Sequence, residues 1–198
     1  MCRLIETIRI CTGQAQQLRW HQSRLENSLR FFWPEAEMID LRSIIKIPDF
    51  AQKGVFKCRV VYGATVESVT FSAYRKKIIN KLVLKEAPGL DYDHKYADRS
   101  GIEILQKNLP RRTEILITKN HLITDASYAN VAFFDGEKWL TPAQPLLHGT
   151  CRAHLIAEGK IARAEIHKND LHLFKKIRLF NAMTDWKNAW ELDAFSAF

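Results

Sequence analysis

Residues 122–152, with the sequence LITDASYANVAFFDGEKWLTPAQPLLHGTCR, contain the pattern that decides the fold. Two apolar-rich runs, Val131 to Phe134 and Lys138 to Leu140, are separated by Asp135-Gly136. This pair is a strong hairpin signal because glycine supplies the positive φ that a tight turn requires. Thr141-Pro142 is expected to end the second strand, since proline cannot donate to a β-ladder. The segment therefore predicts a strand, a sharp turn, a hairpin, and a loop that leads into a helix.

The helix after this hairpin is expected to begin at His148-Gly149-Thr150 and to end at Gly159. A Gly-Thr pair at a helix start offers backbone N–H groups, a hydroxyl and the positive end of the helix dipole, which together suit an anion. An ordinary N-cap explains Gly-Thr taken alone better than an anion site does. The function of this pair therefore depends on the residues around it.

The composition is that of a globular chain with room for a core. The 198 residues are 46% hydrophobic, enough for one large or two small domains. The sequence has no run of eighteen apolar residues, so no membrane span is predicted. The first residues lack the apolar core of a signal peptide. The four cysteines have no C-x-x-C spacing and form no zinc template with the seven histidines. We therefore expect a cytoplasmic protein with no membrane partner.

The net charge of +8 suits an anionic small molecule and suits nucleic acid equally well. The lysines and arginines are dispersed, and no nucleic-acid-binding motif is found. We therefore expect no nucleic-acid partner.

Strand and helix patterns divide the chain into two parts. The expected elements of the first part are strands at 4–10, 55–62, 66–74 and 78–84 and helices at 18–33 and 38–45. Ala87-Pro88-Gly89 has the composition of a boundary turn, which predicts a small α+β domain at 1–88 and a β-rich domain at 89–198. In the second part we expect a helix after Ser100-Gly101, strands at 115–118 and 161–166, a short helix capped by Asn169-Asp170, and a last strand at 177–180. The aromatic tail after that strand packs either on its own domain or on a second subunit.

The order of the parts around the hairpin resembles a known family. An acid and an asparagine (Asp125, Asn130), a hairpin that ends in Thr-Pro, and then Gly-Thr-Cys-Arg are similar to the pyridoxal-phosphate enzymes of fold type IV. This is the class IV aminotransferase family, which includes 4-amino-4-deoxychorismate lyase of folate biosynthesis. Glu-Thr-Ile-Arg at residues 6–9 resembles a segment near the start of family members, although this chain is much shorter than typical members.

The resemblance implies the fold, the cofactor and the assembly. It implies an α/β (α+β) two-domain fold of the D-amino-acid aminotransferase type, with pyridoxal 5'-phosphate held mostly by the second domain. It also implies a homodimer that acts on a small-molecule amine and needs no metal.

The resemblance also assigns a catalytic lysine and its electrostatic partner. Lys95 falls where the family places its Schiff-base lysine, and residues 95–99 resemble the Lys-x-x-x-Arg pattern of the lyase branch. Without the resemblance, a lone lysine would be read as solvated surface. Asp125 is expected to pair with the pyridine nitrogen of the cofactor. The family normally has Glu there, so the carboxylate of Asp125 reaches about 1.5 Å less far, the length of one C–C bond.

The remaining expected contacts are with anionic groups. Arg24, in a His-x-x-Arg pattern that puts it on one helix face with His21, is expected to bind the cofactor phosphate, for which a guanidinium is a natural bidentate partner. A surface salt bridge is the alternative for this pair. The other expected cofactor ligands are Asn130, Gly149, Thr150, Cys151, Asn181 and Ala182. Arg59 is either a clamp for the substrate carboxylate or an edge residue that reaches water, and the sequence leaves the two open.

One local feature separates the activities within the family. Asn181-Ala182-Met183 resembles the turn of the aminodeoxychorismate lyases, which release pyruvate and 4-aminobenzoate, rather than that of the transaminases. The alternatives are a class IV aminotransferase for small or branched-chain amino acids, and an inactive basic protein of the same fold that binds an anion or nucleic acid.

Overall fold

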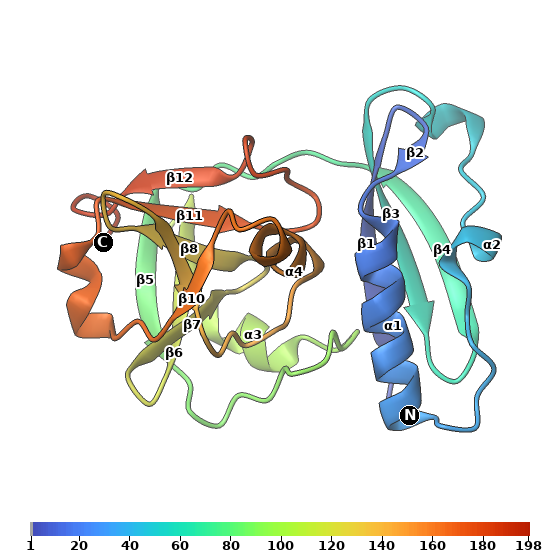
Figure 1. Ribbon diagram of the computed structural model, residues 1–198, viewed down its shortest axis with the longest axis horizontal. Helices are drawn as coiled ribbons and strands as arrows, with labels where there is room; N and C mark the ends of the chain where they lie inside the picture. Colours follow the sequence, from blue (N-terminus) through green and yellow to red (C-terminus); the bar gives the residue numbers. More distant parts are fainter. Residues whose placement is uncertain (1) are drawn as a thin grey trace. The chain divides into compact units, whose positions relative to one another are not determined.

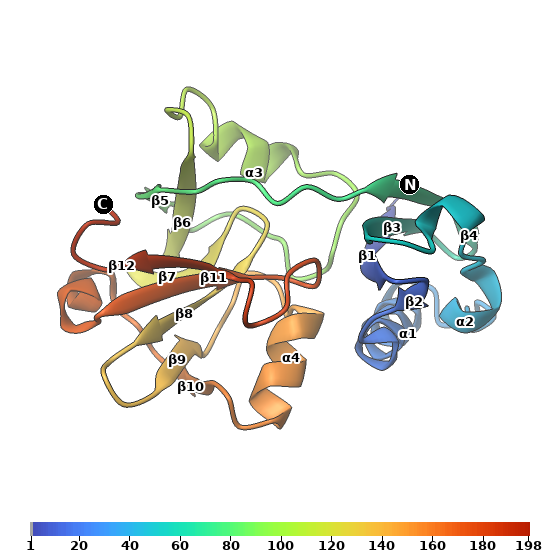
Figure 2. The same ribbon diagram turned by 90° about the horizontal axis from the view of Figure 1, so that it is seen from above.

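The computed structural model describes residues 2–198 and divides the chain into two compact units (Figures 1 and 2). Unit 1 contains the chain up to Arg75 together with His94–Asp98, and unit 2 contains Lys76–Asp93 and Arg99–Phe198. This division differs from the predicted boundary near Pro88, because residues 81–86 form a strand inside unit 2 and residues 94–98 return to unit 1. The mixed α+β class, with more sheet than helix, agrees with the prediction.

Unit 1 is an antiparallel sheet covered by one long helix. The strands lie in the order β2-β1-β3-β4, and their bounds are β1 (Leu4–Cys11), β2 (Gln14–Ala15), β3 (Val55–Tyr62) and β4 (Val66–Ala73). Helix α1 (Leu18–Phe32) contributes Leu25 and Leu29 to the core that it shares with Leu4, Ile8 and Ile10 of β1. A 3-10 turn, η1 (Asp49–Ala51), precedes β3.

The helix predicted over residues 38–45 is longer than the helix observed there. Only α2 (Leu41–Ile44) is helical, because the Asp40 side chain caps it by accepting a hydrogen bond from the Arg42 N–H (2.9 Å) and Ile45 is extended. An aspartate at an N-cap starts a helix rather than continuing one.

The segment His94–Asp98 adds a short extended stretch to β1. The Ile5 N–H donates to the Lys95 carbonyl (2.9 Å), and the Ala97 N–H donates to the Arg3 carbonyl (2.8 Å). These two bonds flank an antiparallel bridge between Leu4 and Tyr96. The backbone of Lys95 is therefore fixed to β1, which lies about ninety residues earlier in the chain.

Unit 2 consists of two sheets that share a core. The larger sheet has the order β10-β9-β8-β11-β12, with β8 (Asn130–Phe134), β9 (Trp139–Pro142), β10 (Ala162–Ala164), β11 (Lys176–Phe180) and β12 (Trp190–Asp193). The smaller sheet has the order β5-β6-β7, with β5 (Lys81–Glu86), β6 (Thr113–Lys119) and β7 (Leu122–Ala126). Apolar side chains of both sheets, such as Leu116 and Phe133, belong to one cluster. The helical elements are α3 (Ser100–Leu105), α4 (Thr150–Ala157) and η2 (Lys168–Leu173).

The predicted hairpin is confirmed in its turn chemistry. Gly136 has a φ of 118°, and the Asp135 side chain accepts hydrogen bonds from the N–H groups of Glu137 (2.8 Å) and Lys138 (2.9 Å). Strand β9 ends at Pro142, as expected. Helix α4 begins at Thr150, and Gly159 follows it with a positive φ of 67°.

The prediction that residues 177–180 form the last strand is wrong. Strand β12 follows and pairs antiparallel with β11, because Trp190 and Leu192 alternate inward while Glu191 and Asp193 face water. The tail packs on its own unit, since Trp190 is in the core and the Ala197 carbonyl accepts from the Leu82 N–H (2.6 Å). Among the described residues, no helix is long and apolar enough to cross a membrane.

Candidate active site

A charged cluster lies in the core of unit 1. The alternation of β1 puts Leu4, Glu6, Ile8 and Ile10 on the face that packs against α1, so Glu6 occupies a position between two core residues. Its side chain is fully buried. It accepts hydrogen bonds from His21 Nδ1 (2.5 Å), Arg24 Nε (2.8 Å) and Arg24 Nη2 (2.5 Å). Arg24 thus binds the carboxylate with two N–H groups.

The charges of this cluster follow from burial and from the ion pair. Burial alone would raise the pKa of Glu6, but the positive charge of Arg24 and the hydrogen bonds from His21 and Arg24 outweigh it and lower this pKa to about 2. Burial lowers the pKa of His21, and the hydrogen bond to Glu6 only partly offsets this. We conclude that Glu6 is ionised and that a neutral His21 donates its Nδ1 proton to it.

Lys95 lies in the same unit, close to this cluster. The positive charge of Lys95 contributes to lowering the pKa of His21, and the Lys95 backbone is paired with Ile5, next to Glu6 in the chain. The preceding residue, His94, contacts α1 through a hydrogen bond between its Nδ1 and Ser28 Oγ (3.4 Å). Unit 1 therefore gathers two of the predicted residues, Lys95 and Arg24.

Arg59 lies elsewhere in unit 1. In β3 it pairs with Thr7 of β1 and Thr70 of β4, whereas its neighbour Val60 pairs with Glu6. Side chains of successive strand residues point to opposite faces, so Arg59 is on the face of the sheet opposite to Glu6. Its proposed contact with a substrate carboxylate stays a prediction.

A second cluster, in unit 2, surrounds Asp125. Asp125 is the penultimate residue of β7 and Asn130 begins β8, and both are buried. Asn130 Nδ2 donates to Asp125 Oδ1 (2.7 Å) and to the Leu147 carbonyl (2.9 Å), and the Leu147 N–H donates to Asp125 Oδ2 (2.8 Å). The acid and the asparagine together hold the loop that precedes α4.

Asp125 is poised between its two protonation states. Burial raises its pKa to about 7, although the hydrogen bonds from Asn130 and Leu147 and the charge of Arg152 favour the ionised form. A cation placed beside this carboxylate would lower its pKa again. A buried acid of this kind fits the protonated ring nitrogen of pyridoxal phosphate.

The start of α4 is packed tightly against Asn130. A Cβ atom added to Gly149 would lie 1.9 Å from Asn130 Oδ1, so only glycine fits. Gly149 is the N-cap and has no side chain to cap the first turn, whose N–H groups suit an anion. Burial raises the pKa of Cys151 to about 12, so its thiol stays neutral. The backbone N–H of Cys151 is therefore its better hydrogen-bond donor to an anion. Arg152 fixes α4 by donating to the Pro142 carbonyl (2.6 Å).

The turn at Asn181-Ala182 lies at the same end of the larger sheet. Phe180, the last residue of β11, pairs with Asn130, the first of β8. The Asn181 side chain accepts from the Met183 N–H (2.9 Å) and donates to the Tyr128 carbonyl (3.1 Å). Unit 2 thus brings the acid, the asparagine, the α4 start and this turn together.

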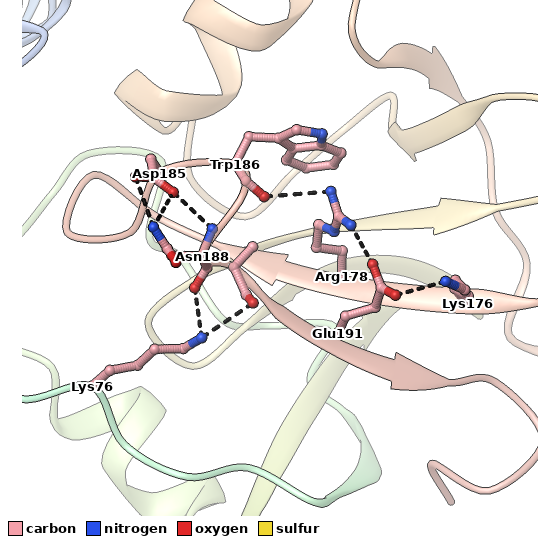
Figure 3. A network of polar contacts seen from close by, with 8 residues as sticks. Lys76, Lys176, Arg178, Asp185, Trp186, Asn188 and Glu191 are labelled. Atoms are coloured by element: carbon pink, nitrogen blue, oxygen red, sulfur yellow. Dashed lines mark hydrogen bonds and ion pairs between the residues drawn. The ribbon is translucent and has the colours of Figure 1, made fainter.

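The loop after this turn is held by two cations (Figure 3). Lys76 Nζ donates to the carbonyls of Asn188 (2.5 Å) and Ala189 (3.1 Å). The Arg178 guanidinium lies 4.5 Å from the Trp139 ring centroid and 4.4 Å from that of Trp186. It also pairs with Glu191, which binds Lys176 as well (2.8 Å).

Two groups in these clusters were not predicted from the sequence. Glu6 was seen as part of a motif but not as the partner of Arg24, although a charged residue in the inward row of an apolar strand is a visible signal. Leu147 acts through its backbone, which leaves no signal in residue type. Among the described residues, no group of three or more His, Cys, Asp or Glu side chains could hold a metal.

Comparison with known proteins identifies the family. The model of the amino-transferase class IV family matches residues 3–188. The chain belongs to the class IV aminotransferases. The prediction of a fold-type IV pyridoxal-phosphate enzyme is thereby confirmed.

Two relatives and one further structure of the same fold are similar to this class IV aminotransferase-family chain. An uncharacterised Haemophilus influenzae protein is 36% identical over 92% of this chain and 98% of its own. A Haemophilus somnus structure, provisionally named as a 4-amino-4-deoxychorismate lyase, is 34% identical with a TM-score of 0.87, covering 93% of this chain and 98% of that one. A Mesorhizobium loti structure, provisionally named as an amino-acid aminotransferase, is 18% identical with a TM-score of 0.80, covering 98% and 99%. This chain covers 98–99% of each of these proteins, so they are similar to it in length.

Proposed function

We propose that this chain is a pyridoxal-phosphate-dependent lyase that acts on 4-amino-4-deoxychorismate and releases pyruvate and 4-aminobenzoate. The observation that carries the proposal is the Asn181-Ala182-Met183 turn, the feature that separates the lyases from the transaminases, fixed here by the bond from Asn181 to Tyr128. The similarity at 34% identity to the Haemophilus somnus protein, which bears the lyase name, supports it.

Each predicted site residue would have its own role toward the cofactor. When bound, pyridoxal phosphate supplies an electron sink for the carbon that carries the substrate amine. Lys95 would bind its aldehyde carbon, and Arg24 would bind its phosphate. Asp125 would pair with the ring nitrogen, and the backbone of Gly149, Thr150 and Cys151 would donate to the phosphate.

The residues of the chain would also carry protons. Lys95 must lose its proton to act as a nucleophile, and its amine can then move a proton at the substrate carbon. Asp125 would stay ionised beside a protonated ring nitrogen, because the cation offsets the cost of burial that raises its pKa. Asn130 would keep the Asp125 carboxylate oriented by its hydrogen bond of 2.7 Å.

The test is an assay for both products. Cofactor-loaded protein is given 4-amino-4-deoxychorismate, pyruvate is measured with lactate dehydrogenase, and 4-aminobenzoate is measured by its fluorescence. We expect equal amounts of the two products and none from Lys95→Ala. Amino transfer from small or branched-chain amino acids to a 2-oxo acid, with no pyruvate release from the chorismate compound, would instead support the aminotransferase function.

A further inference from the structure

Glu6 and His21, the buried partners in the ion-pair cluster of Arg24, have no place in the roles assigned so far. Glu6 lies in a row of apolar side chains on β1, between Leu4 and Ile8, yet it is ionised. Three hydrogen bonds, from His21 and Arg24, satisfy it. The Arg24 side chain is 14% exposed, whereas those of Glu6 and His21 are fully buried. The cluster therefore has one member that reaches the surface.

Stability alone is a weak reason for such an arrangement. Taking two charges out of water costs several kcal/mol per ion, and an apolar replacement of similar volume is often as stable or more so. At this position an apolar residue would continue the row of Leu4 and Ile8. A buried carboxylate here is better explained by what it does to the arginine.

The geometry determines how Arg24 can bind another group. A guanidinium has five N–H donors in one rigid plane, and the two bonds to Glu6 use Nε and Nη2. Two bonds to a fixed carboxylate set both the position and the plane of the guanidinium. His21 in turn binds Glu6 Oε2, the oxygen that Arg24 Nη2 also contacts, so it holds that oxygen in place.

We propose that Glu6, supported by His21, is a positioning residue that orients the Arg24 guanidinium for the phosphate monoester of the cofactor. This inference rests on the proposed function. Glu6 offsets the positive charge of Arg24 and therefore does not strengthen the attraction of that charge for phosphate. What Glu6 contributes to phosphate binding is the orientation of the guanidinium. Its removal should therefore weaken the binding of the phosphate group specifically.

The experiment compares pyridoxal phosphate with pyridoxal, which lacks the phosphate. The dissociation constants of both compounds are measured on the cofactor-free protein by absorbance titration. The dissociation constant of pyridoxal divided by that of pyridoxal phosphate isolates the contribution of the phosphate, since both compounds use the same aldehyde. For Glu6→Gln we expect this ratio to fall by about tenfold, with pyridoxal affinity unchanged. Glu67→Gln, an exposed acid that pairs with Arg3 in the same unit, serves as the matched control and should leave the ratio unchanged.

A second background tests whether Glu6 acts through Arg24. Arg24→Lys removes the planar fork and should lower the ratio, and adding Glu6→Gln to it should cause no further fall. If Glu6→Gln does not fold, His21→Leu tests the same claim, because it removes one support of the carboxylate and should lower the ratio in the same direction.

The outcomes separate this inference from the proposed function. Equal losses for both compounds in Glu6→Gln, or an unchanged ratio, would show a merely structural role and overturn the inference. A further fall of the ratio in the double variant would also overturn it. Failure of the parent protein to bind pyridoxal phosphate would instead contradict the proposed function.

Discussion

Gly149→Ala is the substitution whose effect can be worked most directly from the structure. The new Cβ would lie 1.9 Å from Asn130 Oδ1 and 3.0 Å from its Cγ, so the Asn130 side chain must move. Asn130 is short and is held by hydrogen bonds to Asp125 (2.7 Å) and to the Leu147 carbonyl (2.9 Å). Each lost bond costs about 1 kcal/mol, and a buried group left without its partner costs about 1–3 kcal/mol. We therefore expect a loss of about 2–5 kcal/mol in the free energy of unfolding.

Urea unfolding followed by circular dichroism measures this loss. Gly89→Ala is the matched control in the same unit, because a Cβ at Gly89 meets no atom within 4 Å, and its change should stay within about 0.5 kcal/mol. The double variant Gly149→Ala/Asn130→Ala should be no less stable than Asn130→Ala, since the clash disappears with the Asn130 side chain. Additive losses in the double variant would refute the reasoning.

Two further predictions concern unit 2. The raised pKa of Asp125, about 7 against its usual 3.8, means that the folded state holds a proton that the unfolded state has released, so the stability of the cofactor-free protein should fall as pH rises from about 4 to about 7. Asp125→Asn should remove this pH dependence of the free energy of unfolding. Parallel pH profiles of that free energy for parent and variant would contradict the prediction. Arg178→Ala removes the cation between the Trp139 and Trp186 rings and should cost about 1–3 kcal/mol in urea unfolding, whereas the exposed Arg111→Ala should cost almost nothing. Equal losses for the two arginine variants would rule out the stacked arrangement as a source of stability.

The parts that the sequence predicted well depend on neighbouring residues. The hairpin at Asp135-Gly136 and the α4 start at Gly149-Thr150 follow from local turn and cap chemistry, which short-range patterns record. The Leu18–Phe32 helix was likewise visible from its apolar spacing.

The parts that it missed depend on partners far away in the chain. The bond between the Lys95 carbonyl and Ile5 could not be read from a loop that separates two apolar runs. Strand β12 is short and half exposed, so its pattern is weak until β11 is placed beside it. The pairing of Glu6 with Arg24 needed the alternation of β1 and the face of α1 to be considered together. Local patterns thus predicted the hairpin and the start of α4, but not the contacts between residues far apart in the chain.

Borohydride reduction tests the central claim, that this chain binds pyridoxal phosphate through Lys95, most directly. The cofactor-loaded protein is reduced, digested and analysed by mass spectrometry. We predict that the phosphopyridoxyl group is fixed on the peptide that contains Lys95, and that Lys95→Ala loses this label while keeping its circular dichroism spectrum. Label on a different lysine, or an undiminished label in Lys95→Ala, would contradict the claim.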